Sequence, residues 1–220
     1  MRRFAAAMIA ASTAMAACGG GATTSDRAIP NAARPIARVR AVADVTEVGD
    51  KEQATSTGCG VERWSVKTGT DADRYKVSLT NVVDTSIATL RTKARPSSLP
   101  STHRVAPVET TMWREYAYLV EYKKEDDSDI HLVLKNKAGQ TMIAEIPSPS
   151  CVGSTSPFRS LIGATRSVFT STYSVTTSWK TGRGRLIRLR GVGFFDYVHG
   201  QTGVAPNGIE LHPVTGIRFP

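Results

Sequence analysis

Acidic residues and histidines recur at a spacing of two in the second half of the chain. Glu210 and His212 form one such pair and Asp129 and His131 another, and His199 lies in the polar loop before the first pair. Residues two apart on a β-strand share a face. Imidazole and carboxylate groups bind zinc or manganese and act as general acids and bases. The pattern makes Asp129, His131, Glu210 and His212 candidate metal ligands, and His199, Glu210 and His212 candidate catalytic residues.

These pairs also have a purely structural interpretation. No His-Glu-x-x-His spacing joins the groups locally, and the two pairs need not meet in space. In that interpretation both are half-exposed strand faces with structural hydrogen bonds, and Asn207 and Glu210 hold the long loop. The sequence therefore predicts no cofactor, although the pairs leave room for a divalent metal.

A second group of candidate residues is basic and aromatic. Arg185, Arg188 and Arg190 lie on one predicted strand, and Trp179 stands just before it. OB-folds bind single-stranded nucleic acids and oligosaccharides on such surfaces. We therefore predict that these four residues bind a ligand. The alternative is a solvated edge strand, on which Arg and Lys side chains deter aggregation.

The charge balance favours an anionic partner but does not indicate which class of anion it is. The formal net charge is +9, and a basic surface attracts phospholipids, acidic glycans and nucleic acid. Val83-Asp84-Thr85 resembles the Val-Asp-Thr of staphylococcal-nuclease-like OB-folds, but over three residues only. Ile87 stands where that family has an acidic residue. A nuclease-like, metal-dependent hydrolase is therefore the alternative to a binding module.

The N-terminus has the features of an export signal. Two arginines precede an uncharged stretch, 4–17, that is too short to span a membrane. Met15-Ala16-Ala17-Cys18 resembles the cleavage site of bacterial lipoproteins. We predict a signal peptide over 1–17 and a lipid anchor at Cys18, which would hold the protein to a membrane of the cell envelope. The alternative is ordinary cleavage, which would give a soluble periplasmic or secreted protein.

Composition divides the remainder in two. Residues 18–57 are rich in Ala, Gly, Ser, Thr and Pro and contain no aromatic residue. Such a segment cannot bury enough apolar surface to offset its chain entropy, so we expect a disordered tether. Residues 58–220 have the size of a single domain, and we expect that domain to be rich in β-structure.

Hydrophobic alternation predicts strands through most of this domain, and one segment has helical spacing. The predicted strands are Val61–Lys67, Arg114–Tyr122, Ile130–Leu134, Gln140–Ile146, Arg185–Phe195 and Ile209–Val214, with shorter ones at Tyr75–Leu79 and Val82–Leu90. The predicted helix covers Pro157–Phe169, with Ser156 as its N-cap. Glu125–Ser128 is expected to be an exposed turn, and Lys137–Gly139 a hairpin turn with Gly139 at positive φ. This order predicts a mainly β, OB-fold-like Greek-key barrel with one helix; the alternative is a β-sandwich with one packed helix.

Two cysteines remain once Cys18 is set aside as the lipidation site. In an oxidising compartment Cys59 and Cys151 are expected to form one disulfide, and the alternative is two buried thiols. A metal site on these cysteines is disfavoured because neither belongs to a Cys-x-x-Cys pair.

Four runs of the domain together resemble a family of exported bacterial proteins. They are Cys59 with Glu62–Thr68, Asp129–Leu134, Thr141–Pro147 and His199–Val214. The resemblance covers most of residues 58–214. It implies that Cys59 and Cys151 pair and that the last run is the signature of the family, and it implies no activity.

From these observations we expect a binding or interaction module attached to the cell envelope. Its partner would be an anionic polymer or an envelope protein, with nucleic acid as a weaker candidate. The competing hypothesis is a hydrolase built on the Asp/His and Glu/His pairs.

Overall fold

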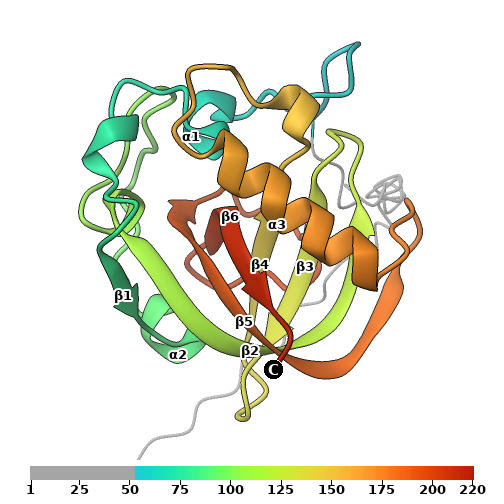
Figure 1. Cartoon of the computed structure of the whole chain (residues 1–220). Coiled ribbons are helices and arrows are strands. Elements are labelled where there is room, and N and C mark those ends of the chain that lie inside the picture. Colours follow the sequence, from blue (N-terminus) through green and yellow to red (C-terminus); the bar gives the residue numbers. More distant parts are fainter. Residues whose placement is uncertain (1–52) are drawn as a thin grey trace, which may run out of the picture. The chain divides into compact units, whose positions relative to one another are not determined.

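The computed structural model describes residues 53–220 (Figure 1). The predicted signal peptide, Cys18 and all but the end of the predicted tether lie outside the described residues. The helices are α1 (Trp64–Thr68), α2 (Ile87–Leu90) and α3 (Arg159–Thr172), and the 3-10 turns are η1 (Arg74–Lys76), η2 (Val108–Thr110) and η3 (Pro149–Cys151). The strands are β1 (Val82–Asp84), β2 (Met112–Lys124), β3 (Ile130–Lys135), β4 (Thr141–Ile146), β5 (Lys180–Phe195) and β6 (Ile209–Arg218).

Six strands form one mixed sheet. Its order is β1-β2-β3-β4-β6-β5, and β5 also pairs with β2, so the hydrogen-bonded pairings close into a ring. β1 is parallel to β2 and β4 is parallel to β6, whereas the other neighbours are antiparallel. The prediction of a mainly β domain with one substantial helix is confirmed. In the described part of the chain, no helix is long and apolar enough to cross a membrane.

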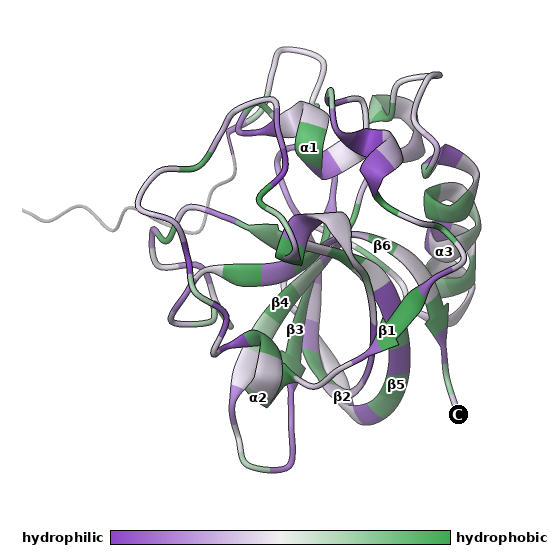
Figure 2. Ribbon diagram, turned by 90° about the vertical axis from the view of Figure 1, so that its left-hand side faces the viewer, coloured by the Kyte–Doolittle hydropathy of each residue, from purple (hydrophilic) through white to green (hydrophobic). Residues whose placement is uncertain are grey.

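The main core follows the alternation of the strands. Ile130, Leu132 and Leu134 of β3 pack into it together with Leu211 of β6, while His131 lies on the opposite face of β3. Figure 2 shows hydrophobic and hydrophilic residues following one another along the strands. Because successive side chains on a strand point to opposite faces, one face builds the core and the other is left for polar groups.

A bulge changes which tyrosines of β2 share a face. The sequence predicts that Tyr116, Tyr118 and Tyr122 lie together, but the pairing shifts between Leu119 and Glu121. An extra residue in one strand reverses the alternation beyond it. Tyr122 is therefore buried in the core, while Tyr116 remains 57% exposed.

The long helix α3 covers the sheet with the face that was predicted. Ile162, Thr165 and Phe169 are buried, and the ring of Phe169 contacts that of Tyr122 edge-on at 5.2 Å between centroids. The helix begins at Arg159, two residues later than predicted. The Ser156 hydroxyl accepts a hydrogen bond from the Phe158 N–H at 3.2 Å, so it orders the turn just before the helix.

The predicted strand Val61–Lys67 is wrong, because this segment contains the short helix α1. Its shape depends on a distant partner: Arg63 Nη1 and Nη2 donate to both carboxylate oxygens of Glu109, at 2.7 and 2.8 Å. The helix ends at Gly69, whose φ of 77° suits glycine. A contact across 46 residues leaves no trace in local alternation, which explains the error.

Two other predicted strands also differ. Tyr75–Leu79 forms no strand and overlaps η1, while Val82–Leu90 divides into β1 and α2. The Ser86 hydroxyl caps α2 by accepting the Thr89 N–H at 3.1 Å, and this cap ends the extended segment. The predicted hairpin turn before β4 is present, with Gly139 at φ 83°.

The predicted disulfide is confirmed. Cys59 and Cys151 are bonded across a sequence separation of 92 residues. The bond ties the segment before α1 to η3, and Trp64 adds a hydrogen bond from its indole N–H to the Cys151 carbonyl, at 3.3 Å. The disulfide and this hydrogen bond together attach the N-terminal segment of the described chain to η3.

Candidate functional site

Six ionisable residues meet on the face of β3, β4 and β6 that turns away from the main core. We call them the buried cluster: Asp127, Asp129, His131, Glu145, Glu210 and His212, all at most 3% exposed. His131 of β3 stands directly opposite Glu145 of β4 in the strand register. The alternation that sends Ile209 and Leu211 into the core sends Glu210 and His212 into this cluster.

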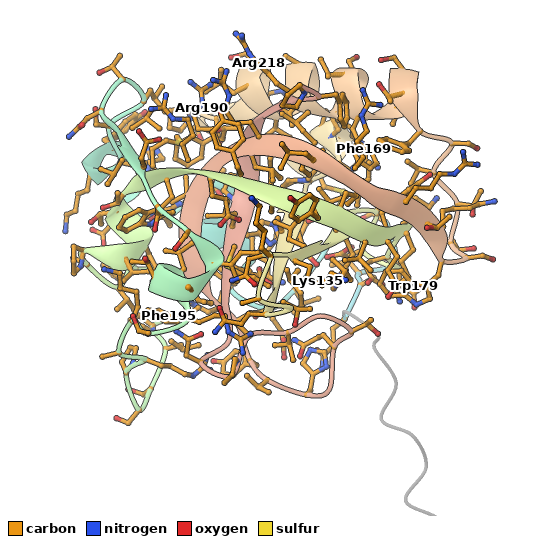
Figure 3. All side chains as sticks on the ribbon, turned by 90° about the horizontal axis from the view of Figure 1, so that it is seen from below. Lys135, Phe169, Trp179, Arg190, Phe195 and Arg218 are labelled. Carbon is orange, nitrogen blue, oxygen red and sulfur yellow. A yellow bond between two sulfur atoms is a disulfide. The ribbon has the colours of Figure 1, made fainter. Side chains whose placement is uncertain are left out.

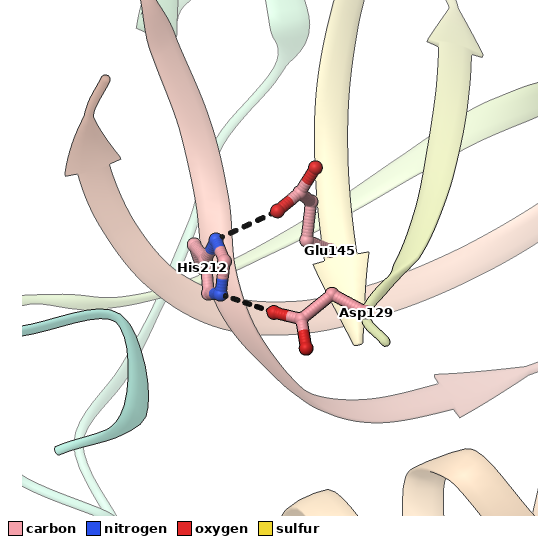
Figure 4. A group of neighbouring side chains, drawn as sticks. All are labelled: Asp129, Glu145 and His212. Atoms are coloured by element: carbon pink, nitrogen blue, oxygen red, sulfur yellow. Dashed lines mark ion pairs between the residues drawn. The ribbon is translucent and has the colours of Figure 1, made fainter. Parts of the chain in front are cut away.

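His212 lies between the carboxylates of Asp129 and Glu145 (Figure 4), and Glu210 is a third carboxylate in contact with it. Its Nδ1 forms a hydrogen bond of 3.1 Å with Glu210 Oε1. Glu145 Oε2 is also 3.1 Å from Nδ1, and Asp129 Oδ2 is 3.2 Å from Nε2. Burial alone would lower the pKa of His212, but the contacts with Asp129, Glu145 and Glu210 outweigh it and hold the pKa well above its usual value.

His131 uses both of its ring nitrogens. Nδ1 lies 3.1 Å from Glu145 Oε1 and 3.2 Å from Glu125 Oε1, and Nε2 donates to the Thr202 carbonyl at 3.0 Å. Burial opposes its charge, but the two carboxylates raise the pKa of His131 to about 10. His131 is therefore an imidazolium, and both of its nitrogens are occupied by hydrogen bonds, to Glu145 and to the Thr202 carbonyl.

The carboxylates of the cluster divide into two kinds. Burial would raise the pKa of Glu145, but its contacts with His131 and His212 hold that pKa well below the usual value. Burial raises the pKa of Glu210 to about 8, helped by the charges of Asp196 and Glu145. It likewise raises that of Asp127 to about 8, helped by Asp129 and Glu145. Glu145 thus remains ionised and contacts both histidines of the cluster.

The cluster is enclosed by charged and aromatic neighbours. Lys67 of α1 is completely buried, and its Nζ is 3.1 Å from Asp196 Oδ2. Trp179 covers the His131 side, with its ring edge-on to the imidazole at 5.4 Å between centroids and 4.7 Å from Lys123 Nζ. These side chains help to close the cluster off from the surface, and its six members are at most 3% exposed.

The structure brings together four of the residues predicted from spacing: Asp129, His131, Glu210 and His212. His199 does not belong to this group; it is partly exposed on the preceding loop, where its backbone N–H donates to Gln201 Oε1 at 3.0 Å. Figure 3 places Trp179 well apart from Arg190, so the predicted ligand-binding set is divided. Arg185 also departs from that set and lies over the ring of Phe219, 4.6 Å from its centroid.

Sequence reasoning missed two members of the cluster, Asp127 and Glu145, and also their neighbour Glu125. The acidic run before β3 was expected to be an exposed turn, but Glu125 and Asp127 are 5% and 0% exposed. Asp127 Oδ1 accepts the Asp129 N–H at 2.9 Å, so this turn folds inward. Glu145 was also missed, although it alternates with Ala144 and Ile146 and so had to lie on the face away from the core.

A second, open region lies on the outer face of β2, β5 and β6. Arg114 stands opposite Arg190, and Arg188 stands opposite both Tyr116 and Arg218. We call Arg114, Arg188, Arg190 and Arg218, with Tyr116 and Tyr118, the arginine face. Figure 3 shows Arg190 and Arg218 near one another.

The arginine face is hollowed in two neighbouring places. A hollow of about 260 Å³ is lined by all four arginines and, within the described chain, by no carboxylate. A second, of about 400 Å³, is lined by Tyr116, Tyr118 and Leu186. Tyr116 pairs with Arg188 in the strand register, so the two hollows adjoin along β5.

No protein-family model, curated protein or solved structure is similar enough to the chain to count as a match.

Proposed function

We propose that the domain is an OB-like module that binds an anionic polymer across the arginine face. The OB assignment is supported by the strand pairings. Three consecutive antiparallel strands are followed by α3, and the last two strands return so that β6 pairs with β4 in parallel and β5 with β2. This order of five strands, with a helix after the third, agrees with that of an OB-fold and supports the proposal.

The like-charged pairs across β2, β5 and β6 carry this proposal. Like charges directly opposite each other on neighbouring strands destabilise a sheet. Arg114 donates from Nε and Nη2 to Asp84, at 2.5 and 2.7 Å, but the hollow beside it still gathers three further guanidinium groups. Arg190 Nε is buried and has no hydrogen-bond acceptor in the segment 53–220. An arrangement that costs stability in the free protein is explained by an anionic ligand that neutralises it.

The chemistry of the face fits a repeating anion. Guanidinium groups bind phosphate, sulfate and carboxylate through paired hydrogen bonds. The exposed ring of Tyr116 and the neighbouring Tyr118 offer planes on which bases or sugar rings stack. From Arg190 to Leu186 the strand runs about 13 Å. A polymer lying along β5 would therefore meet arginines first and aromatic rings next.

The proposed place of action follows from the N-terminus. Export and a lipid anchor at Cys18 would put the domain at the envelope, where acidic polymers and phospholipid surfaces are the available anions. The disulfide between Cys59 and Cys151 is consistent with folding in an oxidising compartment.

The competing hydrolase hypothesis receives less support. The histidine and carboxylate groups on which it depends are at most 3% exposed, and Trp179 and Lys67 lie beside them. A hydrolytic site needs an opening through which substrate and water reach the reacting groups. The open arginine face offers a ligand such access.

A binding titration with matched variants tests the proposal. Fluorescence anisotropy would be measured for a labelled single-stranded oligonucleotide and a labelled sulfated oligosaccharide, each added to the wild-type protein. Arg188→Ala/Arg190→Ala is expected to weaken binding of at least one probe ten-fold or more. Lys180→Ala/Arg183→Ala is the control, because it removes the same charge from a separate hollow that Tyr122 and Tyr173 line.

The control should retain most of the affinity. An equal loss in both variants would show that net charge alone attracts the probe, and no binding of either probe would reject the proposal. Preference between the probes would identify the polymer class.

A further inference from the structure

We propose that Asp129, Glu145 and His212 bind one divalent transition-metal ion inside the domain, independently of the arginine face. One polar atom from each of the three lies within 4.8 Å of the others, and all three residues are buried. Each side chain is held through one polar atom and presents a second that has no hydrogen-bond partner in the described structure: Asp129 Oδ2, Glu145 Oε2 and His212 Nε2.

The first orienting contact fixes His212. Its Nδ1 is hydrogen-bonded to Glu210 Oε1 at 3.1 Å, which leaves Nε2 on the other side of the ring. A carboxylate on one imidazole nitrogen and a metal on the other is the usual arrangement of metal-binding histidines. Glu210 therefore positions His212 as a ligand, and the ion would displace the proton that the neighbouring carboxylates hold on Nε2.

The second and third contacts fix the two carboxylates. Asp129 Oδ1 accepts the Ser148 N–H at 3.0 Å, and its Oδ2 faces His212 Nε2 at 3.2 Å without forming a hydrogen bond. Glu145 Oε1 is bonded to His131 Nδ1 at 3.1 Å, and its Oε2 lies 3.1 Å from His212 Nδ1. An N···O separation near 3.2 Å is also what two ligands of one metal show when each lies about 2.1 Å from it.

Unpartnered buried polar atoms are costly, and here they gather in one place. Leaving one such atom without a partner costs about 1–3 kcal/mol, more when it is charged. Asp127 Oδ2 is a further unpartnered oxygen in the same cluster, and it is a candidate for a fourth ligand. The ion pairs of Asp129 Oδ2 and Glu145 Oε2 with the His212 ring offset part of this cost, and a single ion that accepts all these lone pairs would remove the remainder.

The donor set and the enclosure indicate the kind of ion and its role. One imidazole nitrogen and carboxylate oxygens suit zinc, with manganese as a second choice. Calcium and magnesium prefer oxygen ligands alone. Because the site is closed, a structural ion that holds β3, β4 and β6 together fits better than one that activates a substrate.

Metal content of the full chain tests this inference. The protein would be refolded with excess ZnCl₂, dialysed, and analysed by native mass spectrometry and elemental analysis. We expect one zinc per chain in the wild type. His212→Gln and Asp129→Asn are each expected to weaken zinc binding at least 100-fold, and Glu210→Gln, which keeps all three ligands, 10- to 100-fold.

The control is His103→Ala/His199→Ala, which removes the two histidines outside the cluster and should retain one zinc per chain. Wild-type protein without stoichiometric zinc would overturn the inference, and it would leave His212 as an ion-paired imidazolium. Loss of zinc in the control would overturn it as well. If His212→Gln does not fold by circular dichroism, Glu210→Gln and the wild-type stoichiometry still decide.

Discussion

The buried cluster and the arginine face share strand β6, but their charged groups are arranged in opposite ways. β6 contributes Glu210 and His212 to the first and Arg218 to the second. In the cluster, carboxylates and histidines alternate at about 3 Å and are sealed by Trp179 and Lys67. On the arginine face, like charges stand opposite one another in an open hollow.

The difference shows that access to solvent decides whether a charged strand face contributes to stability or is available to bind a ligand. Without water, an unpaired charge is expensive, so the cluster must neutralise its members among themselves or with an ion. With water present, arginines tolerate one another and remain available to a ligand. The first region therefore contributes to stability, and the second is suited to binding.

The largest expected effect is a loss of stability on removal of the disulfide, which holds the segment that contains Lys67 near the buried cluster. Cys59→Ser/Cys151→Ser opens a loop of 92 residues in sequence separation. Chain-entropy models assign such a loop about 4 to 5 kcal/mol, or about 10 to 20 °C in melting temperature for a domain of this size. Thermal unfolding followed by circular dichroism would measure the shift. An unchanged melting temperature would show that the disulfide does not stabilise this part of the domain.

Lys67→Met should lower stability by about 3 to 5 kcal/mol, because it leaves Asp196 charged and buried without Lys67. Urea unfolding at neutral pH would measure the change in unfolding free energy. Arg159→Met, an exposed change on α3, serves as the control and is expected to shift the midpoint far less. Equal shifts in both variants would contradict the view that the Lys67 side lies in a dry interior.

Glu115 offers a third and intermediate test. Burial raises its pKa to about 8, from 4.5 when exposed, and neither carboxylate oxygen has a hydrogen-bond partner among residues 53–220. Its folded form holds a proton more tightly than the unfolded form, so its contribution is complete below pH 4.5 and is lost as pH rises through 8.

Glu115→Gln removes that loss and should stabilise the protein at pH 7 by on the order of 3 kcal/mol. Unfolding free energies measured between pH 5 and 9 would test it. The gap between the unfolding free energies of variant and wild type should widen from pH 5 to about pH 8 and then level off; a gap that stays constant over the whole range would mean that Glu115 does not titrate there.

The smallest expected effect is on the arginine face. Arg188→Ala should change the unfolding free energy by no more than about 0.5 kcal/mol, because the side chain is solvated and faces other arginines. A slight gain in stability is the expected direction, since one like-charge contact is removed. A loss of several kcal/mol, measured by urea unfolding, would assign Arg188 to packing instead of binding.

Local sequence patterns predicted which face of a strand each side chain occupies, but not which side chains of different strands come into contact. Alternation correctly put Ile130 and Leu211 toward the core and His131 and His212 away from it. That these histidines share one cluster depends on β4 pairing with both β3 and β6, and local alternation does not specify this pairing.

The arginine face shows the same limit. Arg188 and Arg190 could be grouped from one strand, but Arg114 and Arg218 join them only through the cross-strand register. The segment around Arg63 was mistaken for a strand because its helix is set by Glu109, far along the chain.

The salt dependence of polymer binding tests the central claim most directly. The association constant of the wild-type protein with a single-stranded oligonucleotide would be measured from 50 to 300 mM NaCl. We predict a linear fall of log K with log [NaCl], with a slope that becomes shallower by about one unit for each of Arg188→Ala and Arg190→Ala and stays unchanged for Arg183→Ala. Binding that is independent of salt, or a slope altered equally by Arg183→Ala, would contradict a specific arginine face.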